Sequence, residues 1–199
     1  MRNRRIRRVG LRRTAALLLA VAPLAACVGS ESRQSFEDEV HARGGGLSQD
    51  LAAQAVGAVE SELHVDSLRL RSLDVTPGHV GMEVLVPHSV EDLDRYGYGT
   101  SGMYGGGGLS GPDPVARSFD EASLEAQVFT LRQAGVDHLD ETVDRAVDEA
   151  GLDGGYATGA TVVRLPGEPD PQTAVTVTNV RRTITVTFGS DGSVLEVQR

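Results

Sequence analysis

Apolar residues recur at helical spacing near the start of the main body of the chain. Within residues 48–63, Leu51, Ala55 and Val59 are each four positions apart, so they share one face of a helix. Ser48 precedes this run and can accept hydrogen bonds from the free N–H groups of a first helical turn. The pattern predicts an amphipathic helix over residues 48–63.

Two more segments show helical spacing beyond the middle of the chain. Residues 137–150 carry a second apolar face, with Asp137 as the expected N-cap and Gly151 as the C-terminal stop. Apolar residues three and four apart also predict a helix over residues 118–134. Residues 129–131 within it could equally be extended, because Phe-Thr-Leu also suits a strand.

Alternating apolar and polar residues predict the strands. Residues 65–75 and 79–86 flank a Pro-Gly pair, which predicts a hairpin with one buried face. A short strand is expected around Tyr96, leading into a glycine-rich flexible loop that extends to Gly111. Four segments rich in threonine and valine predict further strands, the last three as a meander: 156–165, 172–180, 182–188 and 193–198.

The order of these elements defines the fold class. Short turns between consecutive strands require antiparallel pairing, so an α+β fold is predicted, with an antiparallel sheet and packed helices. A helix followed by strands occurs twice, which suggests halves at 47–111 and 115–199 within one domain over residues 47–199. This arrangement resembles small extracytoplasmic modules of the cystatin-like or PepSY kind, and actinobacterial lipoproteins of unknown function are similar.

The first 26 residues have the features of a secretory signal. Seven of the 19 basic residues lie in the first 13 positions without any acidic residue, and an uncharged apolar stretch follows up to Ala26. That stretch is shorter than the roughly 20 apolar residues of a membrane-spanning helix. A removable signal peptide over residues 1–26 is therefore predicted.

A four-residue motif spans the end of the predicted signal peptide. Leu24, Ala25, Ala26 and Cys27 resemble the lipobox of bacterial lipoproteins, whose pattern is Leu, small, small, Cys. The resemblance implies cleavage before Cys27 and lipidation of its thiol, with acyl chains such as palmitate. The chain would then be anchored at the outer, extracytoplasmic face of the cell membrane. An ordinary cleavage site followed by a chance cysteine is the alternative.

Charge and cysteine content limit the partners and the compartment. Polar residues 27–46 end in three glycines and predict a flexible tether. Without its signal the chain has 12 basic and 28 acidic residues, a formal charge of −16, so no nucleic acid partner is expected. Cys27 is the sole cysteine, which leaves the domain without an internal disulfide. All 19 basic residues are arginine, a bias typical of GC-rich actinobacterial genomes.

The sequence contains no complete catalytic, cofactor-binding or metal-binding motif. Residues 99–103 begin like the G-x-S-x-G motif of hydrolases, but Met103 replaces the second glycine. The glycine run at 105–108 lacks the Lys-Ser/Thr of a P-loop. His138 and Glu141 lie one turn apart on the predicted second helix, where a solvated surface is the simpler interpretation. No catalytic residue, cofactor or metal site is therefore predicted.

Three tyrosines provide the candidate recognition loop. Tyr96, Tyr98 and Tyr104 border or lie in the glycine-rich segment, and tyrosine on an adaptable backbone offers a large contact area at a small entropic cost. The alternative is that the rings cover one end of the sheet. Tyr96 and Tyr98 have strand-like spacing that directs both rings to one face, which makes Tyr104 the stronger candidate for contact.

These features favour a non-enzymatic binding or accessory module of the cell envelope. Its expected partners are the membrane, through the lipid anchor, and an envelope protein or small ligand. One alternative is an envelope hydrolase that uses paired carboxylates, because acidic residues are plentiful and sequence spacing does not show which of them meet. Another is an assembly factor for an exported protein, which an unprotected sheet edge would favour.

Overall fold

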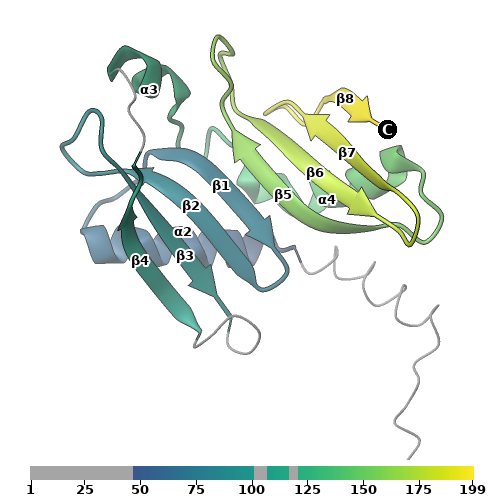
Figure 1. Ribbon diagram of the computed structural model, residues 1–199, viewed down its shortest axis with the longest axis horizontal. Helices are drawn as coiled ribbons and strands as arrows, with labels where there is room; N and C mark the ends of the chain where they lie inside the picture. Colours follow the sequence, from purple (N-terminus) through teal and green to yellow (C-terminus); the bar gives the residue numbers. More distant parts are fainter. Residues whose placement is uncertain (1–46, 101–106, 117–120) are drawn as a thin grey trace, which may run out of the picture. The chain divides into compact units, whose positions relative to one another are not determined.

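The computed structural model describes residues 47–100, 107–116 and 121–199. In this part of the chain, eight antiparallel strands form one sheet in the order β4-β3-β2-β1-β5-β6-β7-β8 (Figure 1). The predicted α+β class is confirmed. The strands are β1 (Leu70–Thr76), β2 (His79–Leu85), β3 (Leu93–Gly99), β4 (Gly108–Pro114), β5 (Tyr156–Val163), β6 (Gln172–Thr178), β7 (Thr183–Phe188) and β8 (Val194–Gln198).

Two helices cover one face of this sheet. Helix α2 (Gln49–Leu63) packs on β2, β3 and β4, and helix α4 (Leu139–Ala150) packs on β5, β6 and β7. Both lie behind the strands in Figure 1. As predicted, α2 begins after Ser48, whose hydroxyl accepts hydrogen bonds from the backbone N–H groups of Asp50 and Leu51 at 3.1 and 3.4 Å. This cap satisfies donors that the first helical turn leaves free.

The chain repeats one motif, a helix followed by four antiparallel strands. The first copy runs from α2 to β4 and the second from α4 to β8. They join where β1 pairs antiparallel with β5, and in each copy the later strands lie progressively further from this junction. Each helix ends in a left-handed residue, His64 with φ 56° and Gly151 with φ 59°. The predicted pattern of two helix-plus-strands halves is therefore present, although β4 continues to Pro114, beyond the expected end of the first half at residue 111.

The two halves share one hydrophobic core. Leu73 faces Val162, and Val75 faces Ala160, across the central β1–β5 pair, and all four side chains are buried. Residues of both helices belong to the same buried cluster. Burying each aliphatic side chain of this kind contributes about 1.5–3 kcal/mol, so the junction adds directly to stability. Each half alone would expose the strand that pairs across this junction, which is β1 in the first half and β5 in the second.

Residues 108–114 form a strand where a loop was expected. They are rich in glycine and proline, yet they pair with β3 as the edge strand β4. Pro112 and Pro114 are compatible with this position because an edge strand needs only half of its N–H groups for pairing. At Gly111, φ is +104° and a Cβ would lie 2.6 Å from the Arg95 carbonyl oxygen. Only glycine fits that close approach.

The helix predicted over residues 118–134 is much shorter in the structure. Helix α3 spans Glu121–Gln127, and residues 117–120 lie outside the described part of the chain. Phe129 is extended instead, and it exchanges backbone hydrogen bonds of 2.7 and 2.8 Å with Leu70. Pairing with β1 satisfies these buried backbone groups and ends the helix. The extended alternative is thus the one found at Phe129.

The start of the second helix also differs from the prediction. Asp137 is not its cap, because the chain first forms a 3₁₀ turn, η2 (Val136–His138), after Gly135 in a left-handed conformation. No side chain caps α4 at His138. The Asp140 carboxylate instead accepts a 2.9 Å hydrogen bond from the Gln49 backbone N–H of α2. This bond ties the N-termini of the two helices together.

Candidate functional site

The three predicted recognition tyrosines do not share one environment. Tyr96 lies on β3 opposite Met82 and is only 2% exposed, so it belongs to the core beneath α2. Tyr98, two residues further along the strand, is half-buried and packs against the same core. Burial raises the pKa of the Tyr96 phenol, and the carboxylates of Asp94 and Glu62 raise it further. Tyr104 lies outside the described residues.

The predicted signal peptide, the lipid-attachment residue Cys27 and the tether 27–46 also lie outside the described residues. Among the residues that are described, no helix is long and apolar enough to cross a membrane.

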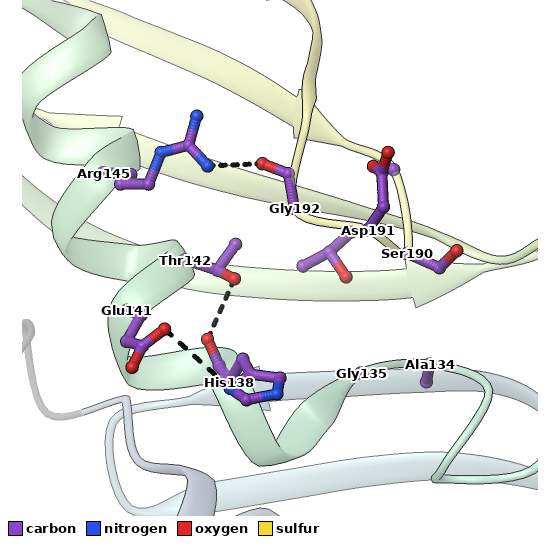
Figure 2. Close-up of a pocket in the computed structure, with 11 residues that line it drawn as sticks. Ala134, Gly135, His138, Glu141, Thr142, Arg145, Ser190, Asp191 and Gly192 are labelled. Carbon is purple, nitrogen blue, oxygen red and sulfur yellow. Dashed lines mark hydrogen bonds and ion pairs between the residues drawn. The ribbon is translucent and has the colours of Figure 1, made fainter.

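A polar pocket of about 390 Å³ lies between the first half of α4 and the β7–β8 turn (Figure 2). Arg145 reaches across it and donates a hydrogen bond to the carbonyl oxygen of Gly192. Its guanidinium also lies 5.6 Å from the centre of the Phe188 ring, which holds the turn against the helix. The other polar side chains that line the pocket are His138, Glu141, Thr142, Thr173, Ser190 and Asp191.

Most polar groups of this pocket already have partners within the protein. Asp191 accepts hydrogen bonds from the Ser193 backbone N–H at 2.9 Å and the Ser193 hydroxyl at 2.6 Å, and these bonds lower the pKa of Asp191. The Thr142 hydroxyl donates to the His138 carbonyl oxygen at 2.9 Å. The Nδ1 atom of His138 lies 3.8 Å from Glu141 Oε2. The turn residues are thus held by local structure.

This pocket lacks the requirements of a paired-carboxylate hydrolase. Such an enzyme needs one carboxyl group that stays protonated near neutral pH, which burial normally provides. Asp191 is fully exposed and its lowered pKa keeps it ionised. The side chain of Glu141 is 82% exposed, so the pocket does not bury this carboxyl group. Within residues 47–100, 107–116 and 121–199, no three His, Cys, Asp or Glu side chains are grouped to hold a metal ion.

The face of the sheet opposite α2 and α4 has a different character. One row of register partners crosses all eight strands on this face, and only Asp74 and Glu196 in it are charged. The Asp74 carboxylate accepts a 2.8 Å hydrogen bond from the Thr161 hydroxyl beside it. The other members of the row have small side chains or none: Ser110, Gly97, Gly81, Ala174 and Thr187.

The neighbouring rows of this face differ from each other. One contains Thr176 and its β7 partner Thr185, both half-exposed. The other is charged on β2, β3 and β4, where Glu83 forms a 2.9 Å ion pair with Arg95 and Asp113 is the β4 partner of Arg95. We call this surface, from Ser110 on β4 to Glu196 on β8, the uncovered face. Helix α3 packs at one end of it, against Leu85 and Leu93.

Acidic residues are concentrated on the helix layer instead. The outward side of α4 exposes five carboxylates, so the helix layer carries a strong negative field. They are Asp140, Glu141, Asp144, Asp148 and Glu149. The strands on which α4 packs, β5, β6 and β7, contain no charged residue, so charge density differs between the two sides of this part of the domain. Such a difference separates a surface that maintains solubility from one that is suited to contact.

Comparison with known proteins finds no matching family model, no matching curated protein and no matching solved structure.

Sequence patterns did not predict the pocket or the extent of the uncovered face. The pocket joins residues of α4 to a turn almost fifty positions later in the chain, and the Ser-Asp-Gly-Ser segment indicated only a turn. The alternating threonines of β6 and β7 did signal one polar face on each strand. They did not signal that this face continues across the whole sheet.

Proposed function

We propose that this protein is a membrane-anchored, extracytoplasmic binding or accessory module of the cell envelope, and that it contacts its partner through the uncovered face. The observation that carries the proposal is the contrast between the two faces of the sheet. One face is buried under α2 and α4, and on the other face the strands β5, β6 and β7 present small side chains without any charged residue. Charged residues are depleted at the centres of protein interfaces, and the β5–β7 part of this face shows the same depletion.

The predicted anchor supports the same function. Lipidation at Cys27 would hold the domain at the membrane, and twenty tether residues, 27–46, would separate the two. A flexible tether of that length spans about 25 Å on average. The charge of −16 in the mature chain opposes close contact with anionic headgroups. The domain would therefore stand away from the bilayer with its sheet accessible to an envelope protein or polymer.

A sheet edge favours a second candidate function, assistance in the assembly of another exported protein. The edge strand β8 contains no proline, and Leu195 on it is 52% exposed. The other edge, β4, contains Pro112 and Pro114. An edge without proline can accept a strand from another chain through backbone hydrogen bonds. Contact would then occur along β8 and not across the uncovered face.

Two arginines placed on the uncovered face test the leading proposal. Thr176→Arg together with Thr185→Arg puts long charged side chains on adjacent strands at half-exposed positions. We expect capture of the partner from crosslinked membranes to fall at least about tenfold, because a cation buried in an interface without a counter-charge costs several kcal/mol. Thermal stability should fall only modestly, by about 1–2 kcal/mol, because each surface substitution usually costs about 0.5 kcal/mol or less and the two arginines repel each other as register partners.

Two matched variants complete this experiment. Asp144→Arg on the exposed side of α4 changes the net charge by the same amount and should leave capture intact. Leu195→Lys places a charge on the β8 edge, and a loss of capture with this variant alone supports strand addition. Undiminished capture by the double-arginine variant contradicts a role for the uncovered face.

A further inference from the structure

One hydroxyl group that lines the polar pocket has no partner in the protein. Thr173 contributes to the pocket from β6 and is only 8% exposed. It lies on the helix side of the strand with Val175 and Val177, where the other buried residues are apolar. Within the described residues, its hydroxyl makes no hydrogen bond. Buried polar groups are almost always hydrogen-bonded in native proteins, so a partner from outside the chain is expected here.

The Arg145 guanidinium is fixed at the same pocket and has further donors available. Its Nη1 atom donates to the Gly192 carbonyl oxygen, and its central carbon lies 5.6 Å from the centre of the Phe188 ring. Phe188 is the β7 register partner of Thr173, so the guanidinium and the unpartnered hydroxyl are placed by the same pair of strands. Within the described residues, the other N–H groups of Arg145 have no acceptor. Such groups can bind both oxygens of a carboxylate.

The β7–β8 turn supplies a fixed carboxylate to the pocket. Both hydrogen bonds from Ser193 reach the Oδ1 atom of Asp191, so its Oδ2 atom has no partner within the described residues. Figure 2 shows the Arg145 guanidinium and the Asp191 carboxylate on either side of Gly192. The two groups form no ion pair with each other. The pocket thus presents one positive and one negative group, held apart from each other, and each can still accept a ligand.

We propose that this pocket binds a small zwitterion, namely a free amino acid or a short peptide. The ligand carboxylate contacts Arg145, its ammonium group contacts Asp191, and one of its polar atoms pairs with the Thr173 hydroxyl. A volume of about 390 Å³ is within the usual range of small-ligand sites. A ligand without net charge also suits the surroundings, because the carboxylates on the outward side of α4 repel a simple anion. The pocket is on the helix side of the sheet, so this inference does not depend on the uncovered face.

An NMR titration tests this site directly. The full-length protein is labelled with ¹⁵N in detergent micelles, and the backbone N–H signals of Ser190 and Gly192 report on the pocket. L-Alanine and L-alanyl-L-alanine are titrated separately at constant ionic strength. We expect both signals to shift and saturate with at least one probe, with a Kd on the order of 1 mM. Sodium acetate and methylammonium chloride each carry one of the two charges and should bind at least about tenfold more weakly.

Thr173→Val separates a ligand contact from a structural role. Valine has nearly the shape of threonine but lacks the hydroxyl, so the Kd of the saturating probe should rise about fivefold. The melting temperature should stay the same or rise, because a buried hydroxyl without a partner is removed. Thr183→Val, at the opposite end of the β6–β7 pair, is the matched control and should leave the Kd unchanged.

A second pair of variants tests the arginine. Arg145→Lys keeps the charge but loses the planar fork, so it should weaken binding about tenfold or more, whereas Arg181→Lys in the exposed β6–β7 turn should not. If Arg145→Lys does not fold, Thr173→Val supplies the comparison. A lower Kd for the dipeptide identifies a peptide as the ligand, and a lower Kd for alanine identifies a free amino acid. The proposal is overturned if neither probe saturates, if acetate or methylammonium binds equally well, or if either pocket variant folds and leaves the Kd unchanged.

Discussion

Replacing Tyr96 with serine is expected to lower the free energy of unfolding by about 3–5 kcal/mol. The side chain is 2% exposed, and it packs beneath α2 with Met82 as its register partner. Truncation of a buried ring removes its apolar contacts and leaves a cavity that the neighbouring strands cannot fill. Since small domains are stable by only about 5–15 kcal/mol, the variant should be partly unfolded at physiological temperature.

The adjacent tyrosine provides a matched control for this prediction. Tyr98→Ser removes the same ring from the same strand at a half-buried position, so we expect a clearly smaller loss. Urea unfolding followed by circular dichroism measures both variants. A loss below about 1 kcal/mol for Tyr96→Ser would contradict its place in the core. Tyr104 remains the candidate for a contact that stability measurements do not detect.

Substitution of Cys27 by alanine is expected to abolish lipidation completely. Only Cys27 supplies the thiol for a thioether, because the chain has no other cysteine. Metabolic labelling with an alkyne fatty acid should therefore mark the wild-type protein and leave Cys27→Ala unlabelled. The variant should also migrate as a longer chain, because it retains the signal. Two acyl chains give a stable anchor where one binds only marginally, so an unlipidated form without its signal should be released.

A substitution three residues after the cysteine separates lipidation from general effects on export. Ser30→Ala leaves Leu24, Ala25, Ala26 and Cys27 intact and should label as strongly as the wild type. Equal labelling of Cys27→Ala would disprove attachment at this residue.

The elements predicted most accurately are those with a long periodic pattern and a local signal at each end. The first helix has an apolar stripe and a capping serine, and α2 starts one residue after Ser48. Among the four strands after residue 155, β6 and β7 alternate threonine with apolar residues, and the predicted bounds of all four agree with the structure within two residues at each end. In both cases the local preference and the tertiary packing agree, so the sequence pattern alone is sufficient.

The errors arose where neighbours distant in sequence determine the structure. Glycine and proline in residues 108–114 have the composition of a loop, and only the edge position beside β3 allows them to form β4. Phe129 has helical spacing with its neighbours, yet it is extended because it forms two backbone hydrogen bonds with Leu70. Asp137 precedes an apolar stripe as a cap should, but a 3₁₀ turn displaces it.

The uncovered face could not be identified as a candidate binding surface from the sequence alone. A threonine row is a candidate binding surface only if no helix covers it. That depends on α2 and α4 packing on the same face, which local patterns do not specify. By contrast, the resemblance to a lipobox depends on four adjacent residues, so it can be recognised without knowledge of the fold.

Site-specific photocrosslinking in native membranes tests the central claim most directly. A photoreactive amino acid at Thr176 samples the uncovered face, and the same amino acid at Asp144 samples the helix layer. The full-length, lipidated protein is irradiated in cells, and its crosslinked products are separated by size. The account predicts a discrete product from position 176, absent from position 144 and lost when Thr185→Arg is added. Products from position 144 with none from position 176 would contradict it.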